Sequence, residues 1–131
     1  MKPVRLQLSR RRGFDLQAAS AAANGLSAIS CARPGPRGNP FVVGVDGTRE
    51  ECVRLHATIL GGYLVVSKAN VEDQKAHVAY IKQNRSQLRG HNLACFCRLC
   101  PAHKDKGLPM GERCAACGPC HVTNILEAVN R

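Results

Sequence analysis

The residues that could do chemistry in this chain are concentrated near its C-terminal end. Six of the eight cysteines lie between positions 95 and 120, and two histidines lie among or directly after them; the set is Cys95, Cys97, Cys100, His103, Cys114, Cys117, Cys120 and His121. Thiols and imidazoles clustered in this way are typical of metal sites rather than of a disulfide framework. We therefore predict zinc as a cofactor, in one or two ions.

The spacing of the middle residues allows two arrangements of the first ion. Cys100 with His103, and Cys114 with Cys117, are each separated by two residues and together form a knuckle-like set of four ligands. Cys97 in place of His103 would give a four-cysteine ribbon instead. In either case the two side chains of each pair can converge on one tetrahedral ion, and the ion can order a loop that has few apolar residues.

A second ion is expected where a strand meets the last helix. Cys95 and Cys97 are two residues apart on an expected strand, so their side chains point to the same side, and Cys120 and His121 begin the helix. Without residues 98–118, the stretch LACFC would join PCHVTNILEAV as an ordinary strand, turn and helix. We interpret residues 98–118 as an insertion that carries its own complete ligand set.

The stretch CGPCH also allows a catalytic interpretation. A Cys-x-x-Cys box that opens a helix is typical of thioredoxin, but the buried strand before the box and the strand-helix-strand continuation after it are missing here. Cys120 beside His121 could instead be an activated nucleophile, or a zinc ion with three ligands could keep a position open for water. No carboxylate in the cluster is an obvious general base, so a closed structural site is the plainer interpretation.

The elements that must position these residues alternate between strands and helices. Strands are expected at residues 3–9, 26–32 and 92–96, and helices at 15–23, 49–60, 70–90 and from 120 onward, where Val122, Ile125, Leu126 and Val129 share one face. Asp15, Thr48 and Asn70 are expected N-caps, and Glu51 completes a capping box with Thr48. On the long helix at 70–90, Val71, Val78, Ile81 and Leu88 mark the expected buried side.

This alternation predicts the fold class. We expect a small, mostly parallel sheet flanked by helices, in a single domain over residues 1–131, with a zinc-knuckle-like insertion at about 98–118. Cys31 and Cys52 are expected to be small core residues. His56, His77 and His91 lie outside the cysteine cluster; the first two are expected on helix faces, and we assign no role to any of the three.

An anion site is expected in the loop RPGPRGNPF. The loop follows a strand, and ligands of open α/β sheets bind beyond the carboxyl ends of the strands. Arg33 could grip a phosphate or carboxylate there, with Asn39 beside it and the second cysteine set nearby. The plainer interpretations are that Arg33 contacts loop carbonyls and that Asn39 belongs to a simple turn.

Composition indicates an anionic partner and a reducing compartment. The formal net charge is +10, and each zinc ion held by three thiolates would contribute a net −1. Nucleic acid or a nucleotide-like anion is therefore an expected partner, although a basic surface that is merely solvated is the plain alternative. With no tryptophan and five other aromatic residues, the chain is poorly supplied for stacking single-stranded bases. We expect no membrane span and no signal peptide, and hence a cytoplasmic protein.

Three stretches of the chain, ARPGPRGNPF, LRGHNLACFC and PCHVTNILEAVN, resemble a family of small phage and bacterial domains of unknown function. Members of that family carry a GNPF loop and end in LACWC, a short linker, and PCH before a helix. This chain differs at Phe96, where the family usually has tryptophan, and in the insertion between Cys97 and Pro119. The resemblance implies the fold, the location of the site and a phage or prophage relation, but no activity.

These observations lead to two predicted functions of different classes. The first is a zinc-binding α/β domain that binds nucleic acid or a nucleotide-like anion. The alternative is a metal- or cysteine-dependent enzyme that acts on a nucleotide or nucleobase-type substrate through Cys95, Cys97, Cys120 and His121. A third interpretation, an interaction protein acting on a host factor, is not separated from the first by the sequence, and the sequence does not determine the oligomeric state.

Overall fold

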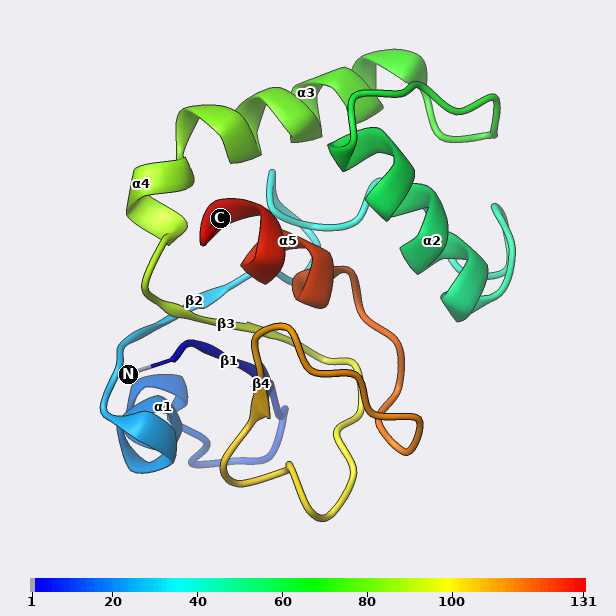
Figure 1. Ribbon diagram of the computed structural model, residues 1–131. Coiled ribbons are helices and arrows are strands. Elements are labelled where there is room, and N and C mark those ends of the chain that lie inside the picture. Colours follow the sequence, from blue (N-terminus) through cyan, green and yellow to red (C-terminus); the bar gives the residue numbers. More distant parts are fainter. Residues whose placement is uncertain (1) are drawn as a thin grey trace.

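The computed structural model describes residues 2–131 and has helices on both faces of a four-stranded sheet (Figure 1). In chain order the elements are β1 (Val4–Gln7), α1 (Leu16–Asn24), β2 (Ala28–Ser30), α2 (Arg49–Leu60), α3 (Val71–Gln83), α4 (Arg85–Leu88), β3 (Asn92–Cys95), β4 (Leu108–Pro109) and α5 (His121–Val129). Helix α1 covers one face, and α5 covers the other with α2 and α3 beyond it. The predicted fold class, a mostly parallel sheet flanked by helices, is confirmed.

The sheet brings the ends of three parallel strands to one edge. The strand order is β2-β3-β1-β4, with β2, β3 and β1 parallel and β4 antiparallel to β1. Two backbone hydrogen bonds extend the ladder beyond the strands: the N–H of Leu8 donates to the carbonyl of Cys95 (2.8 Å), and that of Cys31 donates to Ala94 (2.7 Å). Cys31 and Cys95 therefore lie at the edge where parallel sheets bind their ligands.

Local sequence signals account for the helix boundaries. The Asp15 side chain caps α1, which ends at Gly25 in the left-handed conformation (φ 82°). Thr48 and Glu51 form the expected capping box of α2, with both reciprocal hydrogen bonds present. The apolar face of α5 is fully buried against the sheet; it consists of Val122, Ile125, Leu126 and Val129. Cys31 and Cys52 are buried as expected.

The prediction of a single helix at 70–90 with Val71 on its buried side is wrong in two respects. The structure divides it at Asn84, whose backbone is not helical (φ −106°, ψ 16°) and whose side-chain amide donates to the Tyr80 carbonyl (2.9 Å). Val71 is 42% exposed, because it is the first residue of α3 and lies beyond the end of the apolar contact. Ile81 and Leu88 are buried as expected.

The segment at 98–118 is more closely joined to the sheet than an independent loop would be. Its residues Leu108 and Pro109 form β4, which pairs with Val4 and Arg5 of β1. A small apolar cluster, made of Leu99, Cys100, Leu108 and Cys117, packs inside the segment. The sequence contained no signal for this strand, because two residues are too few to show a periodic pattern. Within residues 2–131, no helix is long and apolar enough to cross a membrane.

Candidate metal centres and anion cavity

The structure brings together the four predicted ligand residues of the segment at 98–118. The donor atoms of Cys100, His103, Cys114 and Cys117 all lie within 4.8 Å of one another. Cys100 Sγ is 3.1 Å from His103 Nδ1 and 3.9 Å from Cys114 Sγ, and Cys117 Sγ is 3.6 Å from His103 Nδ1. In a tetrahedral zinc site, two sulfurs are about 3.8 Å apart and a sulfur and a nitrogen about 3.5 Å apart. We call these four residues the insertion cluster. The distances between their donor atoms are close to those around a single tetrahedral zinc ion.

Backbone amides in the insertion cluster favour thiolates. The N–H groups of Cys117 and Ala116 lower the pKa of Cys114, because they stabilise its charged form. Burial raises the pKa of Cys117, while the backbone N–H of Cys100 donates to its Sγ (3.3 Å) and acts in the opposite direction. Amide donors to cysteine sulfur, such as this one, are the kind of outer contact that supports a metal–thiolate centre.

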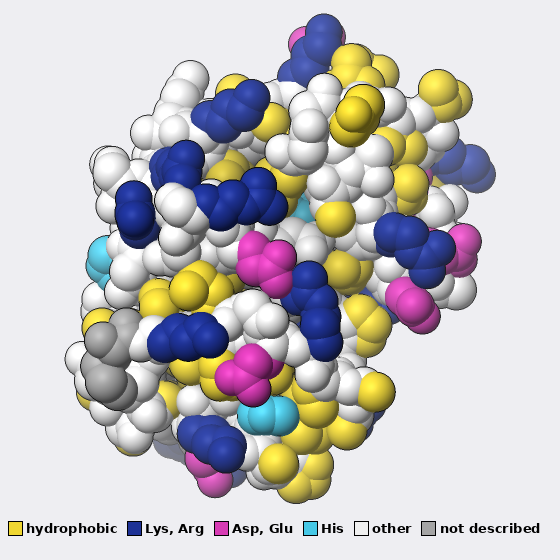
Figure 2. Space-filling view, in the orientation of Figure 1, with side chains coloured by type: hydrophobic (Ala, Val, Ile, Leu, Met, Phe, Trp, Pro, Cys, Tyr) yellow, Lys and Arg dark blue, Asp and Glu magenta, His cyan; other side chains and the backbone are white. Residues whose placement is uncertain are grey.

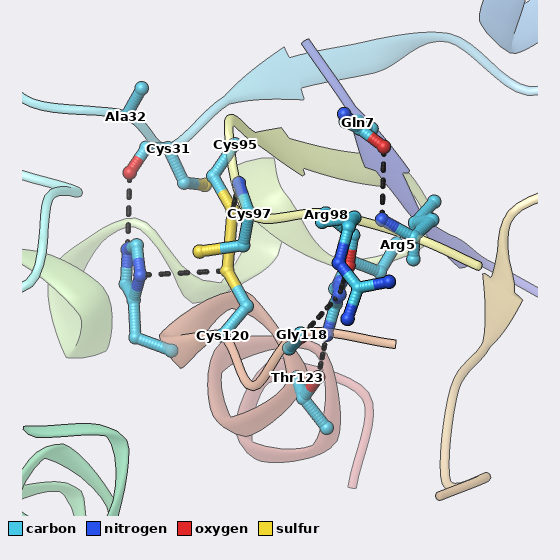
Figure 3. The surroundings of a disulfide bond; sticks show 12 residues. Arg5, Gln7, Cys31, Ala32, Cys95, Cys97, Arg98, Gly118, Cys120 and Thr123 are labelled. Carbon is cyan, nitrogen blue, oxygen red and sulfur yellow. Dashed lines mark hydrogen bonds between the residues drawn. A yellow bond between two sulfur atoms is a disulfide. The ribbon is translucent and has the colours of Figure 1, made fainter. Parts of the chain in front are cut away.

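A second group of donor atoms lies where β3 ends and α5 begins. The sulfurs of Cys95, Cys97 and Cys120 lie within 4.8 Å of one another and point toward a common centre (Figure 3); we call them the junction cluster. The sulfurs of Cys95 and Cys120 are in contact and are drawn as a disulfide. Their Cα atoms are 7.8 Å apart, whereas disulfides usually join Cα atoms about 4.4–6.8 Å apart. This separation fits two thiolates that share an ion better than it fits a direct bond.

His121 faces the junction cluster with one ring nitrogen. Its Nε2 lies 3.1 Å from the carbonyl of Cys31 and 3.0 Å from that of Arg37. Because carbonyls only accept hydrogen bonds, Nε2 carries the proton, and Nδ1 presents a lone pair toward Cys120 Sγ at 3.9 Å. Burial lowers the pKa of His121 to about 4, so the ring is neutral, as a metal ligand must be.

Of the two arrangements considered for the first ion, the donor positions favour the one with His103. Cys97 lies with Cys95 and Cys120, apart from the insertion cluster, so the four-cysteine ribbon is not assembled. The reason is the chain path: Leu99 and Cys100 turn into the buried interior of the insertion, while Cys97 stays at the strand end.

An arginine-lined cavity opens beside the junction cluster. Its volume is about 250 Å³, and it is lined by the side chains of three arginines together with cysteine, histidine and apolar residues; the lining includes Arg10, Arg33, Arg49, Phe96, Cys95, Cys97 and His121. Among the described residues, no aspartate or glutamate lines it. Within residues 2–131, none of the three arginines forms an ion pair with a carboxylate. The three arginines therefore line a space to which the described residues contribute no carboxylate.

Each arginine of the cavity is held by a different contact. Arg49 begins α2, and its Nη1 donates to Cys97 Sγ at 3.3 Å. The Arg10 guanidinium carbon lies 3.9 Å from the centre of the Phe96 ring, a cation–π arrangement. Sequence reasoning did not single out Arg10 or Arg49. Arg49 follows the capping residue of a helix and Arg10 belongs to a run of three arginines, and neither pattern indicates a site.

The two residues expected to bind an anion have structural contacts as well. Arg33 Nη1 donates to the carbonyls of Asn39 and Phe41, both at 3.2 Å. The Asn39 amide group is used twice, because it donates to the Cys52 carbonyl (3.3 Å) and accepts from the Phe41 N–H (3.0 Å). Asn39 thus shapes the loop, and both Arg33 and Asn39 line the cavity.

Comparison with known proteins places most of the chain in one family. The profile of a family described as a domain of unknown function (DUF4326) matches residues 15–131. No curated protein and no solved structure gives a significant match.

Proposed function

The chain belongs to the DUF4326 family, whose description assigns no activity, and we propose that it is a zinc-binding domain that binds a phosphate-bearing, nucleotide-like anion. The observation that carries this proposal is the cavity with Arg10, Arg33 and Arg49, none of which is paired with a carboxylate in the part of the chain that the structure describes. Guanidinium groups match phosphate oxygens in charge and in fork geometry.

The position of the cavity supports ligand binding. It lies at the carboxyl ends of parallel strands, between the loop after β2, the start of α2 and the junction of β3 with α5. Ligands of open α/β sheets bind at this edge, because loops from several strands converge there. A cavity of about 250 Å³ is near the lower end of the range for small-ligand sites, which suits a phosphate with part of a sugar.

A compact anion fits these features better than a long nucleic acid. On the face shown in Figure 2, some Lys and Arg side chains gather at the upper left, whereas the others lie among acidic and hydrophobic side chains. Nucleic-acid binding usually needs a longer row of basic side chains, because it depends on several phosphate contacts in a row. The arginines of the cavity instead converge on one small volume.

Zinc is the metal that suits the two donor groups. Three thiolates with one imidazole are a usual structural zinc set, and soft sulfur ligands disfavour magnesium or calcium. In the insertion cluster all four ligands come from the segment at 98–118, whose own apolar contacts are few. In the junction cluster the fourth ligand would be His121 Nδ1, and the ion would then lie beside the cavity.

The zinc content is tested by native mass spectrometry on protein purified without added metal. We expect two zinc ions per chain, one lost in Cys100→Ser and the other in Cys120→Ser, because the two donor groups are separate. Cys52→Ala, which removes a buried thiol outside both groups, is the control and should keep both ions. Loss of both ions in each single ligand variant would contradict two independent sites.

The anion site is tested by calorimetry with inorganic phosphate, pyrophosphate and the four ribonucleoside monophosphates as probes. We expect one of the phosphate probes to bind, and Arg49→Ala to weaken that binding about ten-fold or more, since a charged hydrogen bond contributes about 1.5–3 kcal/mol. Arg12→Ala is the control, because it removes the same charge from an exposed arginine that does not line the cavity, and it should change the affinity less than two-fold. Absence of binding by the wild type, or equal effects of the two variants, would refute the proposal.

A second candidate function is an enzyme that uses the junction cluster on the same ligand. One observation favours it: Cys95, Cys97 and His121 line the cavity, so a bound anion would touch the metal centre or its thiols. The cavity contains no carboxylate that could act as a base, which favours the binding function. Cobalt substitution separates the two: a change in the visible spectrum of the cobalt protein on phosphate binding would indicate a metal position open to ligand and would favour the enzyme.

A further inference from the structure

Arg5 is a buried cation without a carboxylate partner. It lies on β1, only 2% of it is exposed, and within residues 2–131 no aspartate or glutamate forms an ion pair with it. Burying a guanidinium without an anion costs several kcal/mol, which is why buried arginines are almost always paired. The structure must therefore supply negative charge to Arg5 in some other form.

The hydrogen bonds of Arg5 hold the two ends of the insertion. Its Nη2 donates to the carbonyls of Arg98 (3.1 Å) and Gly118 (2.7 Å), and its Nη1 is 3.4 Å from the Thr123 hydroxyl (Figure 3). The Gly118 N–H donates in turn to the Arg98 carbonyl (2.7 Å), which closes the base of the loop. Arg5 Nε has no hydrogen-bond partner among residues 2–131. Two neutral carbonyls and one hydroxyl accept hydrogen bonds from the Arg5 Nη atoms, but they do not balance the charge.

The groups that can balance the charge are thiolates. Burial lowers the pKa of Arg5, and the side chains that act against this effect are Cys97, Cys117 and Cys114. One of these belongs to the junction cluster and two to the insertion cluster. The Arg5 guanidinium donates to the carbonyls of Arg98, the residue after Cys97, and of Gly118, the residue after Cys117, so Arg5 lies beside both donor groups. A thiol is neutral, whereas a zinc ion held by three thiolates and a histidine is a centre of net charge −1. Metal binding would thus create the missing anion.

We propose that Arg5 is the shared counter-cation of the two metal–thiolate clusters, and that its positive charge raises the zinc affinity of the insertion cluster. This inference rests on the zinc binding proposed above. Arg5 is a positioning residue here: it touches no ligand atom of the metal but fixes the base of the insertion and offsets the charge of the centre. Outer contacts of this kind usually change metal affinity by about 10–100-fold.

The first test is the zinc affinity of Arg5→Met, measured by competition with a chromophoric chelator. We expect zinc at the insertion cluster to bind about ten-fold or more weakly in this variant. Arg98→Met is the matched control, because it removes the same charge from an exposed side chain at the end of the same loop, and its affinity should stay within about three-fold. Equal affinities of wild type and Arg5→Met would overturn the inference.

The second test separates charge from hydrogen bonding. Cys114→His turns the insertion cluster into a centre with two thiolates, two imidazoles and no net charge. If Arg5 acts through its charge, Arg5→Met costs at least three-fold less zinc affinity in the Cys114→His background than in the wild type. An equal cost in both backgrounds means that only the carbonyl contacts matter and refutes the counter-cation role.

A second variant tests the inference if Arg5→Met does not fold with zinc. Arg5→Lys keeps the positive charge but lacks the paired nitrogen donors of the guanidinium group. We expect it to fold and to bind zinc with an affinity within about ten-fold of the wild type. Inability of the folded lysine variant to hold zinc would overturn the inference. Absence of zinc from the wild-type protein would instead refute the proposed zinc binding, which the first measurement of metal content shows separately.

Discussion

Two buried histidines form a hydrogen-bond chain whose protons can be assigned one by one. His77 Nδ1 lies 2.9 Å from the Pro36 carbonyl and must donate to it. His77 Nε2 is then an acceptor, so His56 Nε2, at 2.8 Å, donates to it, and His56 Nδ1 accepts from the Asn124 amide at 3.1 Å. Both rings are neutral in this arrangement, and they connect α2, α3 and α5 to the loop that carries Arg33.

This chain predicts that the protein loses stability in mild acid. Burial lowers the pKa of His56 well below its usual value and also lowers that of His77. The unfolded chain, with histidine pKa values near 6.5, therefore binds more protons than the folded chain below that pH. The contribution of the two histidines to the free energy of unfolding is therefore fully present above about pH 6.5. It decreases as the pH falls, by up to about 1.4 kcal/mol per pH unit for each histidine.

Urea unfolding between pH 7.5 and 5.5, with zinc content followed in the same samples, measures this slope. His77→Gln keeps a group that can donate and accept but cannot be protonated, so the slope should be smaller in this variant. An unchanged slope in His77→Gln would show that the acid sensitivity arises elsewhere, for example from protonation of the metal ligands.

At the scale of elements, the edge strand β4 depends on a glycine just before it. Gly107 has a φ of +79°, and a Cβ atom there would collide with the Val4 side chain and lie 2.9 Å from the Arg5 carbonyl. Gly111, at the other end of the strand, has nearly the same φ (+83°) but nothing within 4 Å of a Cβ atom. Both glycines therefore have a backbone conformation with positive φ, but only Gly107 also lies too close to β1 for a side chain.

We expect Gly111→Ala to cost about 1 kcal/mol, the price of a left-handed backbone with a side chain. Gly107→Ala should cost at least about 2 kcal/mol more, because β4 and β1 must move apart. Urea unfolding of the zinc-loaded variants gives both values, and native mass spectrometry shows whether the insertion cluster keeps its ion. Equal costs for the two substitutions would mean that the insertion does not pack on β1 as described.

At the scale of the whole molecule, stability comes from two different sources. The core between the sheet and α5 is mainly apolar; it includes Leu93, Val122, Ile125, Leu126 and Val129, together with Cys95 and Cys120 of the junction cluster. The insertion has a much smaller apolar cluster and four side chains that could hold a metal ion. We therefore expect the two parts to respond differently to metal removal.

Chelation under reducing conditions should expose the insertion first. Hydrogen exchange of the amides at 98–118 is expected to approach that of an unfolded chain after zinc removal, while β1, β3 and α5 keep most of their protection. Addition of zinc should restore the protection. Uniform loss of protection over the whole chain would show that the sheet also depends on the metal.

The sequence alone was sufficient to predict the elements that are encoded by nearby residues. The capping box of α2, the Asp15 cap, the apolar face of α5 and the short strands around Leu6 and Leu93 all depend on residues within one or two turns of each other. The same is true of the paired cysteines with two-residue spacing. Periodicity and capping are local, so they can be read without the fold.

Only the tertiary structure decided which distant groups meet. Arg5 contacts the Gly118 carbonyl 113 positions later, and Arg49 contacts the sulfur of Cys97 48 positions later. No spacing rule covers such distances, because these contacts result from how whole elements pack. The division of the cysteines into two groups, the cavity of three arginines and the edge strand β4 all have this origin. The sequence determined which residues could bind a metal or an anion, and packing determined which of them face one another.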